Sequence, residues 1–298
     1  MISNRVFASA LALAAFGLAG PAAAADPWAD HVVNYVAGSG TGAYTNSAVT
    51  LGEPTRFIID PPYGGAITPF QAPYQTSDIV TVGNGGSLTV SFDEPVVDDP
   101  LNPFGIDLLI FGNAFYVLDF VTDQATGAVD NNGGLIEVSA NGVDFFPVNG
   151  VAADGPFPTL GYLDVTESFP LNAGAIASDF TRPVNPAFDS TGLTITGIVA
   201  GYNGSGGGVG VDLGVTGLAQ ISYVRISNPN APGGVTPEID AFADVAAVPE
   251  PASLLMFFVG ALILLGKSAR AVNVKEASGG VRGGSDKPLA GWFNREDT

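Results

Sequence analysis

Short apolar runs separated by turn-forming residues dominate the middle of the chain. The runs are rich in Val, Ile, Leu, Phe and Thr, and Gly, Asn, Asp and Pro fill the stretches between them. No stretch of this region keeps the 3.6-residue period of a helix, so the pattern predicts an all-β fold, a β-sandwich or jelly roll. We predict strands at residues 79–82, 87–92, 106–111, 135–140, 143–148, 193–199, 221–227 and 239–245.

Two turns between these runs predict hairpins. Asn141-Gly142 separates the runs 135–140 and 143–148, and this dipeptide tolerates the two positive φ angles of a type I′ turn. A slightly longer turn at Asn84-Gly85-Gly86 joins the runs 79–82 and 87–92. The segments 149–190 and 200–217 are loop-rich, and we interpret the Gly-Ser-Gly-Gly-Gly run at 204–208 as a mobile tip.

The N-terminus has the layout of a secretory signal peptide. Arg5 gives a short positive start, residues 6–18 are apolar, and small residues at 23–25 offer a cut before Asp26. We therefore expect a signal helix at 1–25 and a body at 26–247 that lies outside the cytoplasm.

A second apolar segment follows the last predicted strand. Pro249-Glu250-Pro251 precedes a run at 252–265, and Lys267 and Arg270 follow it. This order of parts resembles the PEP-CTERM sorting signal of Gram-negative bacteria. The resemblance implies export, a transient hold in the inner membrane, processing by an exosortase-type enzyme, and delivery to the cell envelope, the surface or an extracellular polysaccharide matrix. A plain membrane anchor and a buried helix are the alternatives, and the run is short for a bilayer core.

These segments give the expected division of the chain. Residues 1–25 are the signal peptide, 26–247 the ectodomain, 248–270 the sorting signal with one transmembrane helix, and 271–298 a flexible cytoplasmic tail. The tail is longer than is usual after a PEP-CTERM signal. Its basic residues agree with the positive-inside tendency.

The charge and the cysteine content exclude some classes of function for the body. Residues 26–247 hold 24 acidic and three basic residues, a formal charge of −21. Without a cationic stripe, nucleic acid is excluded as a partner, whereas divalent cations are attracted. The chain has no cysteine, which excludes thiol chemistry and disulfides.

A second resemblance concerns the body. The run Gly-Ile-Asp-Leu-Leu-Ile-Phe-Gly-Asn-Ala-Phe at 105–115 is followed by the segments 136–145, 223–226 and 238–242. This order resembles that of bacterial cell-surface proteins with galactose-binding-like, or discoidin-like, jelly rolls. The resemblance implies a fold more than a function.

Catalytic residues are hard to find in this sequence. The single histidine, His31, lies near the start of the body and is a poor member of a Ser-His-Asp triad. Paired acids such as Asp98-Asp99 lie in a Pro-bounded loop, which favours a solvated loop or a calcium ligand over a glycosidase pair. We therefore expect a protein that is not an enzyme.

Calcium is the most plausible cofactor, because Asp and Asn oxygens in loops are its preferred ligands. The segment 119–134 supplies Asp119, Asp123 and Asp130 beside two glycines. Asp107 and Asp240 each interrupt an apolar strand, where an uncompensated carboxylate is costly. An outward-facing position or a hydrogen-bonded acid is the alternative for both.

Several aromatic residues fall in loop-like regions and could stack on a sugar or fill the core. They are Tyr63, Phe70, Tyr74, Phe115, Tyr116 and Tyr202. Together these features predict an exported, non-catalytic surface or exopolysaccharide-matrix protein. A calcium-assisted carbohydrate-binding module is the first alternative, and a secreted glycoside hydrolase is the second.

Overall fold

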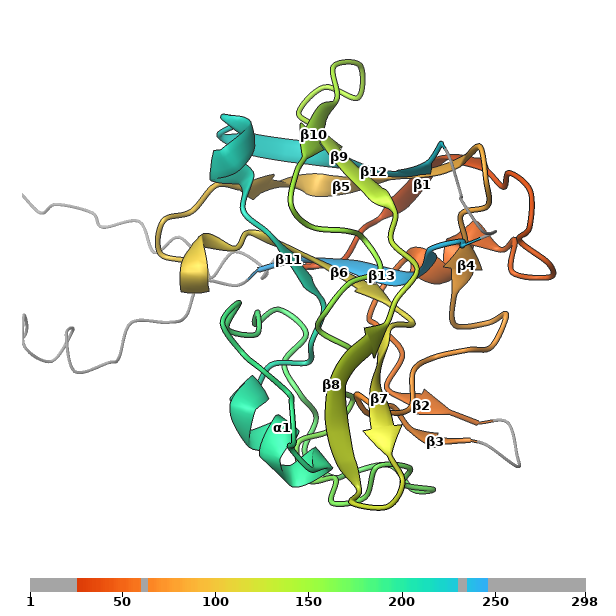
Figure 1. The fold of residues 1–298 in the computed structure, drawn as a ribbon. Coiled ribbons are helices and arrows are strands. Elements are labelled where there is room, and N and C mark those ends of the chain that lie inside the picture. Colours follow the sequence, from red (N-terminus) through yellow and green to blue (C-terminus); the bar gives the residue numbers. More distant parts are fainter. Residues whose placement is uncertain (1–25, 60–63, 230–234, 246–298) are drawn as a thin grey trace, which may run out of the picture. The chain divides into compact units, whose positions relative to one another are not determined.

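Two antiparallel sheets form the centre of the fold (Figure 1). The computed structural model describes residues 26–59, 64–229 and 235–245. The five-stranded sheet has the order β1 (His31–Val36), β5 (Gly86–Val97), β12 (Gln220–Asn228), β9 (Leu135–Ser139) and β10 (Phe146–Val148). The four-stranded sheet has the order β11 (Val209–Val211), β6 (Leu108–Gly112), β13 (Glu238–Asp244) and β4 (Val80–Thr81).

A further set of elements, here called the outer layer, packs beside the four-stranded sheet (Figure 1). It contains the hairpins β2 (Phe57–Ile58) with β3 (Gly65–Ala66) and β7 (Phe115–Asp119) with β8 (Gln124–Asp130), the helix α1 (Ile195–Tyr202) and most of the loop 149–194. Three 3-10 turns complete the described elements: η1 (Ser47–Thr50), η2 (Pro103–Gly105) and η3 (Leu213–Thr216). Because α1 is the one α-helix in the described residues, the predicted all-β class is confirmed.

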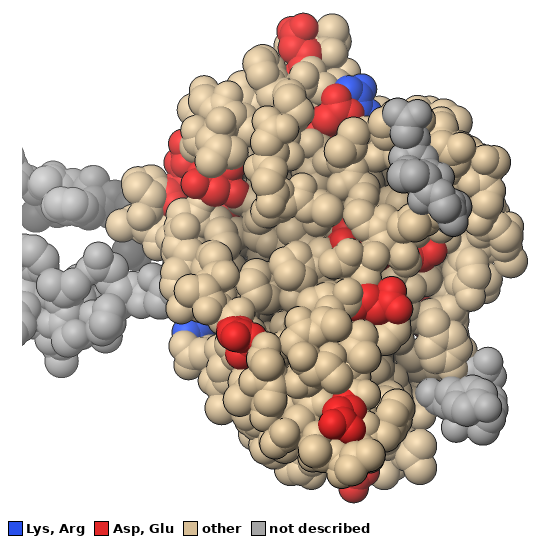
Figure 2. Space-filling model, in the orientation of Figure 1, with Lys and Arg blue, Asp and Glu red and all other residues tan. Residues whose placement is uncertain are grey.

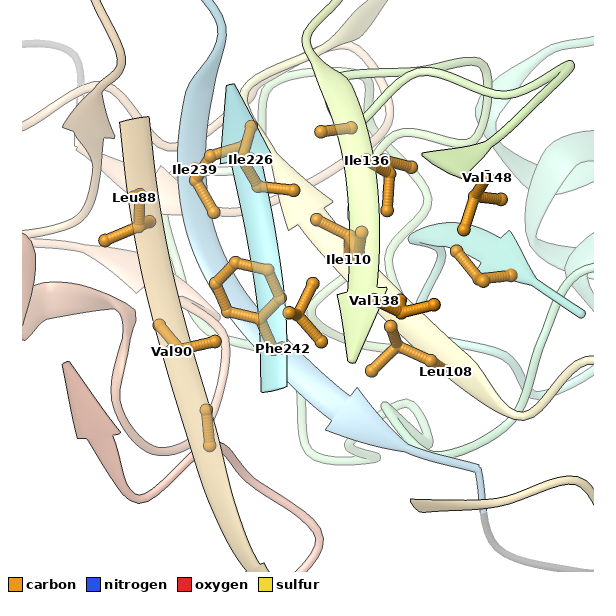
Figure 3. Packing of buried hydrophobic residues seen from close by; sticks show 14 of the residues in the cluster. Leu88, Val90, Leu108, Ile110, Ile136, Val138, Val148, Ile226, Ile239 and Phe242 are labelled. Atoms are coloured by element: carbon orange, nitrogen blue, oxygen red, sulfur yellow. The ribbon is translucent and has the colours of Figure 1, made fainter. Parts of the chain in front are cut away.

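The main core lies between the two sheets (Figure 3). Leu88 and Val90 of β5 and Ile226 of β12 point from the five-stranded sheet toward Ile110 and Phe242 of the other sheet. The alternation in residues 88–92 and 223–227 supplies these side chains, because every second residue of a strand faces the same way. All five are fully or nearly fully buried.

The four-stranded sheet is buried on both of its faces. Leu108 and Ile110 of β6 face the main core, whereas Leu109 and Phe111 belong to a separate cluster on the opposite face. There, Phe111 meets the edge of the Phe180 ring with 5.1 Å between the ring centroids. The continuous apolar run at 108–111 is typical of a strand that is covered on both sides.

The prediction of a strand at 193–199 was wrong, because residues 195–199 form the start of α1. Its buried residues are Ile195, Ile198 and Tyr202, which have helical rather than alternating spacing. Asn203, in the left-handed conformation with φ 50°, ends the helix. A run of seven residues is too short to distinguish the 3.6-residue period of a helix from the two-residue period of a strand.

Both predicted hairpins need correction. The strands β9 and β10 do pair, but the register Phe146↔Val138 leaves a longer connection than a two-residue turn. Asn141 does not have the positive φ of a type I′ turn, and its side chain instead accepts hydrogen bonds from Val143 N and Asp144 N. The runs on either side of Asn84-Gly85-Gly86 do not pair, since β4 and β5 lie in different sheets.

The glycine run at 204–208 was predicted to be a mobile tip, but most of it is buried. Gly207 has φ +88°, and a Cβ there would overlap the carbonyl oxygen of Pro158. Gly206 lies directly against the Phe180 ring. The run therefore lets the backbone pass close to neighbouring chain segments, which a larger residue prevents.

We predict that Gly207→Ala lowers the free energy of unfolding by about 3 kcal/mol or more, because it combines left-handed strain with a backbone overlap. The matched control is Gly52→Ala, since Gly52 has φ +91° and open space around the missing Cβ. The control should cost about 1 kcal/mol. Urea unfolding of both variants measures the difference, and equal losses would contradict the close packing at Gly207.

Candidate functional site

A largely apolar pocket of about 430 Å³ opens in the outer layer. Its walls come from three separate parts of the chain, at 64–74, 113–115 and 169–171. The lining residues are Gly64, Phe70, Gln71, Ala72, Pro73, Tyr74, Asn113, Phe115, Phe169 and Leu171. A concave apolar surface with a few polar groups is typical of a small-molecule site.

Hydrogen bonds tie the three walls together. The Tyr116 backbone N–H donates to Pro69 O at 2.7 Å, which joins β7 to the turn at 68–71. The Thr68 hydroxyl donates to Ser168 O at 2.7 Å and accepts from Gln71 N, so the same turn also holds the third wall. The pocket is therefore preorganised by these hydrogen bonds, which lowers the entropic cost of binding.

Alternation in β7 decides which of its aromatic rings face the ligand space. Phe115 and Val117 are exposed, whereas Tyr116 is buried against Phe70 with 6.4 Å between the ring centroids. Tyr116 also shares a hydrogen bond with Tyr202 at 3.2 Å between the two hydroxyl oxygens. Burial raises the pKa of Tyr116 to about 12, so this phenol stays neutral and serves the core.

Aromatic surface continues outside the pocket. Phe169, which is 43% exposed, lies parallel to Phe120 with an interplanar angle of 7° and 6.2 Å between the centroids. Phe120 is 81% exposed at the tip of the β7–β8 hairpin. Exposed aromatic rings beside a preformed pocket form an apolar patch of the kind that marks binding sites.

The polar side-chain groups of the pocket are the carboxamides of Gln71 and Asn113 and the hydroxyl of Tyr74. The Gln71 side chain donates to Ala66 O at 3.2 Å, and the Asn113 amide makes no hydrogen bond to any described residue. None of the described lining residues is charged. Because a carboxamide both donates and accepts, this lining suits a neutral ligand that carries hydroxyl groups.

The structure brings together three of the six aromatic residues singled out in the sequence. Phe70, Tyr74 and Phe115 line the pocket, whereas Tyr116 and Tyr202 fill the core of the outer layer. Tyr63 lies outside the described residues. Sequence reasoning missed Phe169 and Asn113, since neither lies in a motif that marks a site.

The predicted calcium segment does not gather its acids. Asp119 and Asp123 lie at the tip of the β7–β8 hairpin, whereas Asp130 pairs with Phe115 at its other end. Asp119 instead accepts a hydrogen bond from Val121 N at 2.8 Å, and this bond lowers its pKa. Asp123 accepts a hydrogen bond from the Ser168 hydroxyl at 3.0 Å.

Asp240 is buried in an irregular part of β13 and is a hydrogen-bonded acid. It accepts hydrogen bonds from Thr55 N at 2.8 Å and from the Thr55 hydroxyl at 3.0 Å. Burial raises its pKa to about 7, and the negative charge of Asp78 adds to the rise. Its carboxyl fastens the 53–56 segment to the four-stranded sheet.

Asp154 is another buried acid, and it was not among the residues that the sequence singled out. It accepts hydrogen bonds from Ala114 N at 2.9 Å and Asn132 N at 3.0 Å. Burial raises its pKa to about 7, and the charges of Glu238 and Asp130 contribute further. The residue has no exposed surface, so it fixes the backbone beside the pocket without reaching into it.

Asp107 is the remaining predicted ligand, and it does belong to a cluster. Carboxylate oxygens of Asp98, Asp107 and Asp212 lie within 4.8 Å of one another. Nearby, burial raises the pKa of Asp244 to about 6, and the charge of Asp107 adds to the effect. Asp212 was missed because it lies in a segment that was interpreted only as loop.

The predicted sorting residues Pro249, Glu250, Pro251, Lys267 and Arg270 lie outside the described residues, as does the signal peptide at 1–25. Within the described part of the chain, no helix has the length and apolar character needed to cross a membrane.

His31 Nε2 lies 2.9 Å from Asp93 Oδ1, and both side chains are more than half exposed.

Comparisons with known proteins give no identification. No protein-family model matches the chain, and a search of curated proteins finds no match.

Two of the buried acids, Asp154 and Asp240, predict an unusual pH dependence of stability. Because Asp154 and Asp240 have pKa values of about 7 in the folded chain and ordinary values when unfolded, the folded state binds more protons between about pH 4 and pH 7. We predict that the free energy of unfolding falls as the pH rises through this window.

Asp240→Asn should flatten that fall by about 1 kcal/mol or more, because an amide does not ionise. Asp119→Asn is the control, since Asp119 is a hairpin-tip acid whose pKa is lowered. Chemical unfolding of the full chain at pH 5, 6, 7 and 8 measures both variants. Stability that rises between pH 5 and pH 8 would contradict the assignment.

Proposed function

We propose that this chain is an exported, non-catalytic cell-surface or exopolysaccharide-matrix protein whose body binds a neutral carbohydrate in the aromatic pocket. The observation that carries the binding role is the meeting of Phe70, Phe115 and Phe169 around one preformed cavity. Sugar rings present flat C–H faces to aromatic rings, and their hydroxyl groups match the carboxamides of Gln71 and Asn113.

The export part of the proposal rests on the two ends of the sequence. The signal-peptide layout at 1–25 and the order Pro249-Glu250-Pro251, apolar run and basic residues favour passage through the inner membrane. An exosortase-type enzyme is the proposed processing partner. A negative charge of −21 on residues 26–247 suits a soluble domain outside the cytoplasm.

A β-sandwich of the jelly-roll type, similar to discoidin-like domains, is the proposed fold class. The shared core between the two antiparallel sheets supports it. In such folds, ligands commonly bind at loops beside the sheets rather than on them. The pocket in the outer layer, which is built from loops and a hairpin, agrees with this arrangement.

Binding is favoured over hydrolysis at the pocket. A glycosidase places two carboxyl groups on either side of the scissile bond, and none of the described lining residues is Asp or Glu. The buried acid Asp154, which holds the backbone at Ala114 beside the pocket, has its oxygens engaged by Ala114 N and Asn132 N. The glycoside hydrolase alternative therefore lacks a carboxyl pair at this cavity.

Binding can be measured by retardation of the full chain in gels that contain a neutral polysaccharide: a glucan, a galactan or a mannan. We predict that at least one of them retards the chain. Phe169→Ala should weaken that binding about tenfold, which corresponds to about 1.4 kcal/mol, because it removes a stacking surface.

Phe146→Ala is the matched control, since Phe146 has a similar exposure of 41% but lies on β10, away from the pocket. It should bind as the unchanged chain does. Retardation by none of the polysaccharides, or equal weakening by both substitutions, would refute binding at this pocket.

Export has its own test, in a Gram-negative host that carries an exosortase-type enzyme. Cell fractions are probed with antibodies to the body and to residues 271–298. The body should be detected outside the cytoplasm, and the protein at the cell surface should no longer react with the antibody to the tail. Glu250→Ala should keep the tail attached. A reporter fused after residue 247 that is active only in the cytosol would refute the export proposal.

A further inference from the structure

Three strand ends converge at one edge of the fold, and each contributes an aspartate. Asp98 follows β5, Asp107 precedes β6 and Asp212 follows β11. Figure 2 shows acidic side chains gathered on this edge, between the teal turn η3 and the gold turn η2 of Figure 1, neither of which is labelled there. The ion pairs of the described residues, Glu53–Arg56, Glu137–Arg225 and His31–Asp93, all lie elsewhere.

Three hydrogen bonds from uncharged donors fix the Asp107 carboxylate, and none of them supplies a positive charge. Asp107 Oδ1 accepts from Asp99 N at 3.1 Å and from Asn102 Nδ2 at 2.9 Å, and Oδ2 accepts from Leu213 N at 3.0 Å. All three donors are neutral. Since each carboxylate oxygen has two lone pairs, Oδ2 keeps one for a cation.

The flanking acids also keep free oxygens. Asp212 Oδ1 caps η3 by accepting from Gly214 N at 2.8 Å, and Oδ2 has no hydrogen-bond donor among the described residues. Asp98 is exposed, and its carboxylate accepts no hydrogen bond from the described residues. Three negatively charged groups therefore point free lone pairs into a small volume.

A buried neutral oxygen provides an independent sign of a missing partner. Asn102 is 6% exposed, and its Oδ1 has no hydrogen-bond donor among the described residues. Its orientation is fixed, because Nδ2 must face the Asp107 carboxylate and an inverted amide would set two acceptors together. Oδ1 belongs to the same planar amide, so this unsatisfied acceptor lies at the cluster.

We propose that Asp98, Asp107, Asp212 and the Asn102 Oδ1 atom bind a calcium ion. A divalent cation satisfies the orphaned amide oxygen and offsets the repulsion among the carboxylates. All the ligands are hard oxygens carried by loops at strand ends, which suits the flexible coordination of calcium. Magnesium demands a stricter octahedral shell, and zinc favours nitrogen and sulfur ligands.

The bound ion would join loops that belong to different sheets. Residue 98 leaves the five-stranded sheet, whereas residues 107 and 212 adjoin the four-stranded sheet. Calcium would therefore fasten the two sheets at this edge and stabilise the folded state. The site goes beyond the carbohydrate proposal, since it shares no residue with the aromatic pocket.

Calorimetry of the full chain tests the site directly. The chain is first freed of metal ions with EDTA and is kept in about 0.15 M NaCl, which screens the nonspecific attraction of calcium to the acidic surface. Titration with CaCl₂ should show one site, and a hundredfold excess over Kd should raise the unfolding midpoint by about 5–10 °C. Asp98→Asn should weaken calcium binding at least tenfold. Because Asp98 is exposed and its side chain has no hydrogen bond to any residue that the structure describes, this variant should keep the fold of the parent.

Glu94→Gln is the matched control, since it removes an exposed negative charge near the same end of β5 but outside the cluster. It should bind calcium as the unchanged chain does. No binding heat and no shift of the midpoint at about 2 mM CaCl₂ would overturn the proposal. Equal weakening by both substitutions, or equal affinity for MgCl₂, would overturn it too, and neither result would bear on the pocket.

Discussion

Burial of the four-stranded sheet on both of its faces is the constraint from which the rest of the structure follows. One face of β6 and β13 packs against the five-stranded sheet, and the other carries Leu109 and Phe111 into a second cluster. A sheet with two apolar faces needs a cover on each side. The outer layer provides the second cover through Phe180, whose ring also lies under the Arg56 guanidinium at 3.9 Å.

The pocket is a consequence of this cover. The outer layer has its own core around Tyr116, Ile198 and Tyr202, and it is built mostly from loops and short hairpins. Loops that cross such a core leave concave surfaces between them, and here Phe115 and Phe169 remain at the rim. The central sheets thus act as a scaffold, and the added layer supplies the surface that can bind a ligand.

Buried carboxyl groups hold the layers in register. Asp240 joins β13 to Thr55, Asp154 joins the end of β6 to residue 132, and Asp107 joins the loops at 99–102 and 213. Asp240 lies at the register shift of β13 and Asp107 directly precedes β6, whereas Asp154 lies in a loop and accepts from N–H groups that follow β6 and β8. At such places backbone N–H groups lack ladder partners. Acids are used for this task because a carboxylate accepts several N–H donors at once.

The strands of the central sheets could be predicted from local sequence, and the site mostly could not. Period-two alternation at 88–92 and 223–227 and the continuous run at 106–111 identify β5, β12 and β6 because burial on one or two faces leaves a local pattern. The prediction of a strand at 193–199 failed because a seven-residue run is compatible with both the two-residue period of a strand and the 3.6-residue period of a helix. The pocket walls at 64–74, 113–115 and 169–171 meet only through tertiary packing, so Phe169 carries no local signal.

Amide hydrogen exchange of the full chain, with and without the neutral polysaccharide that retards it, tests the central claim most directly. The account predicts slower exchange on binding in peptides that cover 64–74, 113–120 and 168–172, with no change in β9, β10 or β12. Protection confined to the five-stranded sheet, or no protection at all under saturating polysaccharide, would contradict it.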